Sequence, residues 1–121
     1  MRELQTIQTK EKLNRVLAVD NIGPGGANHL YIIEALNNDM DIEPTHIQFQ
    51  RGPRKLVSSV HGALDSDLLE IVRDRLTAFQ AGEFACEYNA EALEHVNAAL
   101  EALNKRVEDR INRNVLGTNN Q

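Results

Sequence analysis

The chain has 121 residues, a formal net charge of −5 at neutral pH and a single cysteine, Cys86. This length suits one domain, and a lone cysteine excludes an intrachain disulfide and any metal site built on paired thiolates. The acidic balance argues against binding of polymeric nucleic acid, because phosphate backbones are held by clustered lysines and arginines. No run approaches the ~18 apolar residues of a membrane-spanning helix, so we expect a cytoplasmic protein without membrane contact.

The first half of the chain predicts short strands, because its apolar residues alternate or form short runs bounded by turn residues. The glycine-rich stretch from Asn21 to Asn28 is typical of a hairpin loop. It does not fit a phosphate-binding loop, because no Lys-Ser or Lys-Thr follows it. Residues 1–55 therefore predict a small antiparallel meander, with candidate strands at Arg15 to Val19, His29 to Ala35 and His46 to Gln50.

A small basic cluster of Arg51, Arg54 and Lys55 follows the last of these strands. It could supplement an anion site or lie in solvent, and we favour the solvated interpretation. The next residues, Val57 to Leu64, show neither a helical nor a strand period, so we expect a connecting loop there.

From Asp65 onward the pattern is helical. The first helix carries an apolar stripe, with Asp65 or Ser66 as the expected N-cap and Gly82 close to its end. The second helix is predicted at roughly Glu87 to Arg113, where six apolar residues recur at spacings of three and four: Leu93, Val96, Leu100, Leu103, Val107 and Ile111. Two helices joined by so short a loop are antiparallel neighbours.

These expectations define one α+β domain over residues 1–121. A small N-terminal antiparallel sheet is followed by a long antiparallel helical hairpin over residues 65–115 and a tail over residues 116–121. The second helix is much the longer, so Val107 and Ile111 need another chain or the sheet to cover them. The aromatic content is also low, with no Trp, two Tyr and three Phe, and we therefore expect an oligomer.

An arginine row on the second helix is the most informative feature for function. Arg106, Arg110 and Arg113 stand at i, i+4 and i+7 and project from one helical face, where like charges repel. Solvation near the helix C-terminus and pairing with Asp109 explain part of the row. Arg110 has no carboxylate at its helical neighbour positions, so a bound anion or a carboxylate of another subunit is the alternative.

Four further residues have both a structural and a functional interpretation. Phe79 lies on the apolar stripe of the first helix and is either a core aromatic or a base-stacking platform. Asn89 either caps the second helix locally or reads a base edge or a ribose hydroxyl. Gly117 and Thr118 either present an N–H and a hydroxyl to a phosphate or belong to an ordinary frayed helix end.

Neither catalysis nor metal binding has a motif in this sequence. The four histidines form no i, i+4 pair, and no second cysteine is present, so zinc-ligand spacing is absent. No nucleophile motif such as G-x-S-x-G and no isolated carboxylate pair occurs. We expect no catalytic residue, no metal and no cofactor.

Several short runs, in order from Ile47 to Thr118, together form a recognisable pattern. They are Ile47-Gln48-Phe49-Gln50, Gly52-Pro53, Asp67-Leu68-Leu69, Asp74-Arg75-Leu76, Phe79-Gln80-Ala81-Gly82, Phe84-Ala85-Cys86, Asn89-Ala90, Ala92-Leu93, Ala99-Leu100, Leu103, Arg106, Arg110, Arg113, Val115 and Gly117-Thr118. With these runs the chain resembles the helical-hairpin family shared by the phage Thoeris anti-defence sponge and the anti-CBASS sponge, and its strand-rich beginning is similar to the Thoeris type. Arg51 departs from the family pattern, which has Asn there.

The resemblance implies a phage-encoded homo-oligomer, typically a hexamer, that acts in the bacterial cytoplasm. Such proteins bind cyclic nucleotide immune signals without cleaving them. One pocket between paired protomers takes a cyclised ADP-ribose or a cyclic dinucleotide, and Phe79, Asn89, Arg106 and Arg110 stand at its matching positions. A second pocket, at a three-subunit junction, takes cyclic trinucleotides and would use Arg113, Gly117 and Thr118.

Two other functions remain open on the sequence. The chain could be an oligomeric interaction module whose arginine row meets acidic protein partners. A hydrolase of cyclic nucleotide signals is a weaker alternative, because no catalytic motif supports it.

Overall fold

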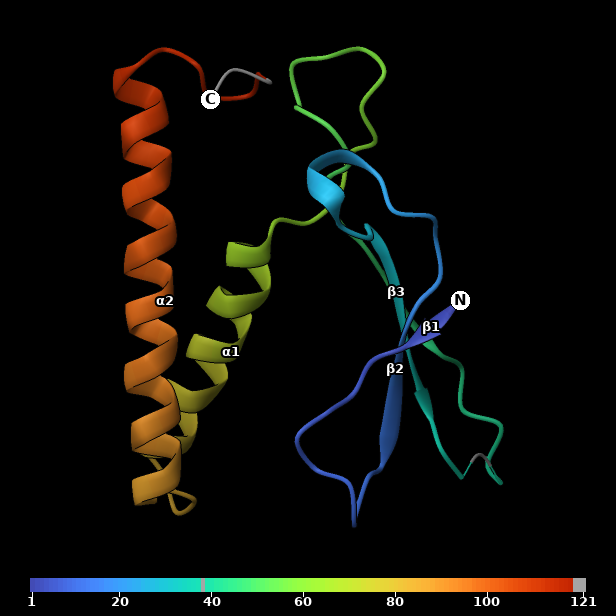
Figure 1. Ribbon diagram of the computed structural model, residues 1–121. Coiled ribbons are helices and arrows are strands. Elements are labelled where there is room, and N and C mark those ends of the chain that lie inside the picture. Colours follow the sequence, from blue (N-terminus) through green and yellow to red (C-terminus); the bar gives the residue numbers. More distant parts are fainter. Residues whose placement is uncertain (38, 119–121) are drawn as a thin grey trace. The chain divides into compact units, whose positions relative to one another are not determined.

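The computed structural model describes residues 1–37 and 39–118. The chain divides into two compact units, Met1–Ala63 and Leu64–Gln121 (Figure 1). The first unit holds the strands and the second holds two long helices, so the predicted α+β order of a small antiparallel sheet followed by a helical hairpin is confirmed. The last part of the predicted tail, residues 119–121, lies outside the described residues.

The sheet has four antiparallel strands in the order β1-β2-β3-β4. All three predicted strands are present, with ends that differ from the predicted ones by at most two residues. The strand β1 was not predicted, because two polar residues carry no alternation; it exists through its pairing with Ala18 and Leu17 of β2. The strands are β1 (Arg2–Glu3), β2 (Asn14–Ala18), β3 (Leu30–Ala35) and β4 (Thr45–Gln48).

The glycine-rich stretch joins the paired strands β2 and β3, so the predicted hairpin loop is confirmed. It contains a short 3-10 turn, η1 (Pro24–Gly26). Gly25 and Gly26 both have φ of 76°, a left-handed conformation that glycine adopts without the steric cost of a side chain.

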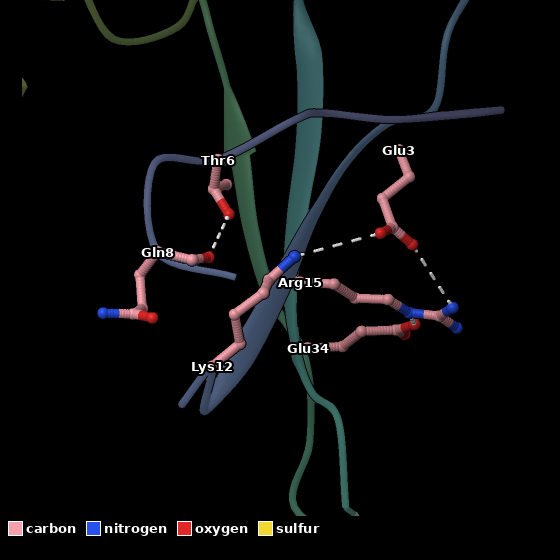
Figure 2. Close-up of polar contacts among 6 residues, drawn as sticks. All are labelled: Glu3, Thr6, Gln8, Lys12, Arg15 and Glu34. Atoms are coloured by element: carbon pink, nitrogen blue, oxygen red, sulfur yellow. Dashed lines mark hydrogen bonds and ion pairs between the residues drawn. The ribbon is translucent and has the colours of Figure 1, made fainter. Parts of the chain in front are cut away.

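An ion-pair network crosses strands β1, β2 and β3 of the sheet (Figure 2). Arg15 of β2 pairs through Nε with Glu34 of β3, and its Nη1 lies 3.7 Å from Glu3 of β1. Lys12 Nζ lies 4.0 Å from the same Glu3 carboxylate. These side chains are partly exposed, so each pair contributes little stability alone. Together they orient the short strand β1 against β2.

Asp20, two residues after the end of β2, connects the two ends of the glycine-rich loop. Its carboxylate accepts hydrogen bonds from Asn28 Nδ2 at 3.1 Å and from the His29 backbone N–H at 3.0 Å. Partial burial raises the pKa of Asp20, but hydrogen bonds from His29, Asn28 and nearby backbone outweigh it, so the pKa lies below its ordinary value.

This lowered pKa predicts a pH-dependent stability. A carboxyl whose pKa is depressed by folding stabilises the protein above its unfolded pKa of about 4, and that contribution is lost as the pH falls through the lower folded value. The melting-temperature difference between the native chain and Asp20→Ala should therefore shrink as the pH falls from about 5 to 3. A difference that stays constant over this range would show that Asp20 acts by packing alone.

Two isolated β-bridges hold the segment after β4: Arg51 pairs with Val60, and Phe49 pairs with Ala63. The predicted connecting loop therefore contains short pairings that no period reveals. Arg54 is exposed and donates hydrogen bonds to Gln50 Oε1 at 3.0 and 3.1 Å, and Lys55 is also exposed. The solvated interpretation of the basic cluster is wrong for Arg51, which is half-buried.

The second unit is a helical hairpin of α1 (Asp65–Gln80) and α2 (Glu87–Asn112), close to the predicted bounds. The predicted N-cap of α1 is wrong. Leu64 occupies that position with extended backbone (φ −99°, ψ 156°), and its N–H donates to Asp67 Oδ2 at 2.8 Å. The Asp67 carboxylate thus accepts from the N-cap N–H, as the third helical residue of a capping box does, and the N-cap Leu64 offers no side-chain acceptor to the first turn.

Leu100 is the one buried hydrophobic residue among the described residues of this unit, with 8% of its surface exposed. Helix α2 has 26 residues against 16 in α1, so its C-terminal part extends roughly 15 Å beyond its partner. Val107 and Ile111 lie on this extension and are 37% and 49% exposed. The apolar seam predicted for α2 is therefore only partly covered within one chain.

Leu100→Ala should destabilise the hairpin, because it removes a buried side chain from the place where the two helices meet. Deletions of this kind cost about 2 to 4 kcal/mol, measurable by urea denaturation. Ile71→Ala is the matched control, since Ile71 of α1 is 57% exposed and its truncation should cost well under half as much. Equal losses at both positions would show that Leu100 is not the centre of the hairpin packing.

Candidate ligand-binding site

An apolar cavity of about 360 Å³ lies at the tip of the hairpin, where α1 ends and α2 begins. Phe79 comes from the last turn of α1 and Asn89 from the first turn of α2, and the short turn between them forces the two together. The structure therefore brings together two of the four residues predicted for the first pocket. The cavity is lined by Leu76, Phe79, Phe84 and Asn89.

The ring of Phe79 is the centre of an aromatic and cationic cluster. It meets the Phe84 ring edge to face, with centroids 6.5 Å apart and planes at 76°. The Arg75 guanidinium carbon lies 5.3 Å from the Phe79 ring centroid, within the range of a cation–π interaction. Sequence reasoning placed none of Arg75, Leu76 and Phe84 at this site, although the spacing of Arg75 and Phe79 at i and i+4 is a usable signal.

Asn89 fastens the turn between the helices. Its side-chain Nδ2 donates to the Phe84 carbonyl at 3.3 Å, and its backbone N–H donates to Cys86 Sγ at 3.4 Å. Cys86, not Asn89, is thus the N-cap of α2. Among the described residues no donor reaches Asn89 Oδ1, so a hydrogen-bond acceptor stands at the wall of the apolar cavity.

At the other end of α2, Arg106 and Arg113 differ in the hydrogen bonds and ion pairs that they make. Arg106 is exposed and makes no hydrogen bond or ion pair with any residue that the structure describes. Arg113 binds the Asp109 carboxylate, with Nε at 3.1 Å and Nη2 at 3.0 Å. The predicted pairing of Asp109 with Arg113 is confirmed, and across residues 1–37 and 39–118 no ion pair joins Asp109 to Arg106.

Arg110 holds the loop that follows α2. Its Nη2 donates to the carbonyls of Val115 at 3.0 Å and Thr118 at 2.9 Å. Gly117 has φ of 80° in this loop, and the Thr118 hydroxyl donates to the Val115 carbonyl at 2.6 Å. Backbone carbonyls therefore stabilise the charge of Arg110, and they place it beside Thr118, which was predicted for the second pocket.

One chain keeps the two halves of the predicted first pocket apart. Asn89 and Arg106 are 17 positions apart on a continuous helix, which is about 25 Å at ~1.5 Å per residue. Only a second protomer could bring the arginines of one α2 helix to the aromatic tip of another.

The described residues show what chemistry this surface offers. An aromatic face and a carbonyl acceptor suit a nucleobase, and arginine forks suit phosphate. No group of three or more His, Cys, Asp or Glu side chains that could hold a metal ion occurs in residues 1–37 and 39–118. Neither α1 nor α2 is both long and apolar enough to cross a membrane.

Comparison with known proteins identifies this hairpin. The family model "Acb2/Tad1, hairpin domain" matches residues 40–108, and the chain belongs to this family. The chain is also 40% identical over 72 residues to "Thoeris anti-defense 1" of Bacillus phage SBSphiJ7, covering 60% of this chain. The matched region spans 50%, or about half, of the length of that curated relative.

Proposed function

We propose that this chain is a phage anti-defence protein that binds and sequesters cyclic nucleotide immune signals in the bacterial cytoplasm without cleaving them. Its ligands would be cyclised ADP-ribose and cyclic di- and trinucleotides. The observation that carries the proposal is the Phe79 and Asn89 cavity at the hairpin tip, within the region matched by the hairpin family. The similarity to an anti-defence protein supports the same role.

The first pocket requires two chains with antiparallel α2 helices. A two-fold axis crossing α2 midway between Asn89 and Arg106 would pass close to Ala98 and Ala99. Small side chains there allow close approach of two helices. This arrangement would bring Arg106 and Arg110 of one protomer to Phe79 and Asn89 of the other.

Each residue then has a distinct role in capture. Adenine would stack on Phe79, and Asn89 Oδ1 would accept from the base amine or a ribose hydroxyl. Arg106 and Arg110 would bind the phosphates through charge-assisted hydrogen bonds. Nanomolar capture requires about −12 kcal/mol, more than exposed ion pairs supply, which is why we favour a ligand enclosed between two protomers.

A second pocket would take cyclic trinucleotides at a junction of three subunits, with Arg113, Gly117 and Thr118. The positive φ of Gly117 turns the loop after α2, and backbone N–H groups in such turns bind anions. The pairing of Arg113 with Asp109 would have to loosen or be shared when phosphate binds.

Calorimetric titration with glyco-cyclic ADP-ribose and with cyclic di- and trinucleotides tests the proposal directly. We expect tight, saturable binding of at least one of them, and no binding of any would contradict the proposal. Mass measurement by light scattering should give an oligomer, with a hexamer as our expectation. A monomer would contradict the intersubunit pockets.

Recovery of the ligand separates sequestration from catalysis. The protein is saturated with the bound ligand, incubated and then heat-denatured, and the released ligand is analysed by chromatography. We expect intact ligand in an amount equal to that bound. Accumulation of a cleaved product would identify a hydrolase instead.

A further inference from the structure

A second cavity, of about 450 Å³, is lined by residues of the sheet unit and shares none of them with the cavity at the hairpin tip. Its volume is in the range of small-molecule sites. It is lined by Val19, Asp20, Asn21, Leu30, Gln48, Arg51 and Val60. The lining combines one carboxylate, one guanidinium and two side-chain amides around a few apolar residues, which is the composition of a polar ligand site.

In the part of the chain that the structure describes, the Arg51 guanidinium of this cavity has no hydrogen-bond or ion-pair partner. Its Nε is buried and without a hydrogen bond, and among the described residues no carboxylate lies within ion-pair distance of its terminal nitrogens. A partly desolvated guanidinium in this state is costly unless something else accepts its hydrogen bonds.

The backbone holds this guanidinium in place. Arg51 exchanges backbone hydrogen bonds with Val60, both at 2.8 Å. The guanidinium lies against Gly23, where an added Cβ would come within 2.8 Å of Nη2 and 3.0 Å of Nε. The loop therefore accommodates the guanidinium because residue 23 has no side chain.

The carboxylate in the cavity does not neutralise Arg51. Asp20 is occupied by Asn28 Nδ2 and the His29 N–H. Each carboxylate oxygen has two lone pairs, so Asp20 can accept further hydrogen bonds. Within the described residues the cavity thus presents an unpaired cation and an acceptor that are not bound to each other. An occupant needs an anionic group for Arg51 and a hydrogen-bond donor, such as a hydroxyl, for Asp20.

We propose that this cavity binds a small sugar phosphate, with its phosphate on the terminal nitrogens of Arg51 and a sugar hydroxyl on Asp20. The planar guanidinium binds two phosphate oxygens at once. Asp20 repels the phosphate and accepts from the hydroxyl, so the two ends of the ligand are distinguished. Every lining residue belongs to the sheet unit, so the site is independent of the function proposed for the hairpin.

The test is a calorimetric titration of the full chain with ribose 5-phosphate, inorganic phosphate and ribose. We expect saturable binding of ribose 5-phosphate with a Kd below about 1 mM, weaker binding of inorganic phosphate and none of ribose. Equal affinity for ribose 5-phosphate and inorganic phosphate would show that the cavity binds an anion only, and would overturn the proposed contact with a sugar hydroxyl. No binding of ribose 5-phosphate at 10 mM would overturn the whole proposal.

Four variants assign the binding to this cavity. Arg51→Gln should raise the Kd for ribose 5-phosphate at least tenfold, since it removes charge-assisted hydrogen bonds. Gly23→Ala should also raise it, because the methyl group displaces the guanidinium. Asp20→Ala should weaken the binding of ribose 5-phosphate, because it removes the acceptor for the sugar hydroxyl, and should not weaken the binding of inorganic phosphate, because the removed carboxylate repels that ion. Lys55→Gln, which removes the same charge from an exposed residue of the same segment, should change the Kd less than twofold.

Thermal melting of each variant checks that it is folded. If Arg51→Gln is unfolded, Arg51→Lys replaces it, because lysine keeps the positive charge but lacks the planar guanidinium that binds two phosphate oxygens. Equal losses in the Arg51 and Lys55 variants would show a net-charge effect and overturn the site. A change of oligomer size in Arg51→Gln with unchanged phosphate affinity would assign Arg51 to a protein contact instead.

Discussion

Arg106→Gln should weaken capture of the cyclic nucleotide ligand by about 10- to 150-fold and leave the melting temperature unchanged. A hydrogen bond to a charged group contributes roughly 1.5 to 3 kcal/mol, which corresponds to that range of affinity. The fold should not respond, because Arg106 is exposed and makes no hydrogen bond or ion pair with the described part of the chain. Isothermal titration and thermal melting measure the two quantities.

Lys105→Gln is the control for this prediction. Lys105 is an exposed cation one position away on another side of α2, and its loss lowers the net charge by the same amount. A similar drop in affinity for both variants would reveal long-range electrostatics only. Unchanged affinity in Arg106→Gln would remove Arg106 from the site.

Arg110 is a less direct test of the same pocket. Its bonds to the Val115 and Thr118 carbonyls hold the loop after α2, so Arg110→Ala removes a phosphate contact and releases this loop at once. The arginine row therefore does not divide simply between two pockets. Arg110 is proposed for the first pocket and donates a hydrogen bond to Thr118, which is proposed for the second.

The fold could be predicted from sequence wherever a repeating pattern was long enough. Spacings of three and four from Leu93 to Ile111 gave α2 within one residue at its C-terminal end. Strand β1 and the bridge between Arg51 and Val60 have only one or two residues, so no period exists for them. The N-cap of α1 was not predicted because Leu64 has no side-chain acceptor, so its residue type does not mark it as a cap.

The site was predictable to the extent that sequence neighbours determine it. Phe79 and Asn89 come together because a short turn separates the two helices. The partners of Arg110 were not predictable, since they depend on positive φ at Asn114 and Gly117, outside any helical periodicity. The burial of Arg51 was equally hidden, because it depends on close approach to Gly23, which is distant in sequence.

Phe79→Leu should weaken capture by roughly 5- to 150-fold with little change in stability. Stacking of a base on an aromatic ring contributes about 1 to 3 kcal/mol, and leucine cannot replace it. Leucine does keep most of the apolar volume beside Leu76 and Phe84, so the packing of the hairpin tip should lose only about 1 kcal/mol. Titration with the adenine-containing ligand and urea denaturation give the two values.

Tyr88→Leu makes this prediction specific. Tyr88 lies in the first turn of α2 near the same tip but is 74% exposed and does not line the cavity, so the same loss of an aromatic ring there should change affinity less than twofold. If Phe79→Leu keeps full affinity, Phe79 is a packing residue and the base must bind elsewhere. If Phe79→Leu lowers the ligand affinity and the free energy of unfolding by similar amounts, the ring acts by maintaining the structure of the hairpin tip and not by contacting the ligand. Lost affinity with retained stability is the outcome that assigns the Phe79 ring to the ligand.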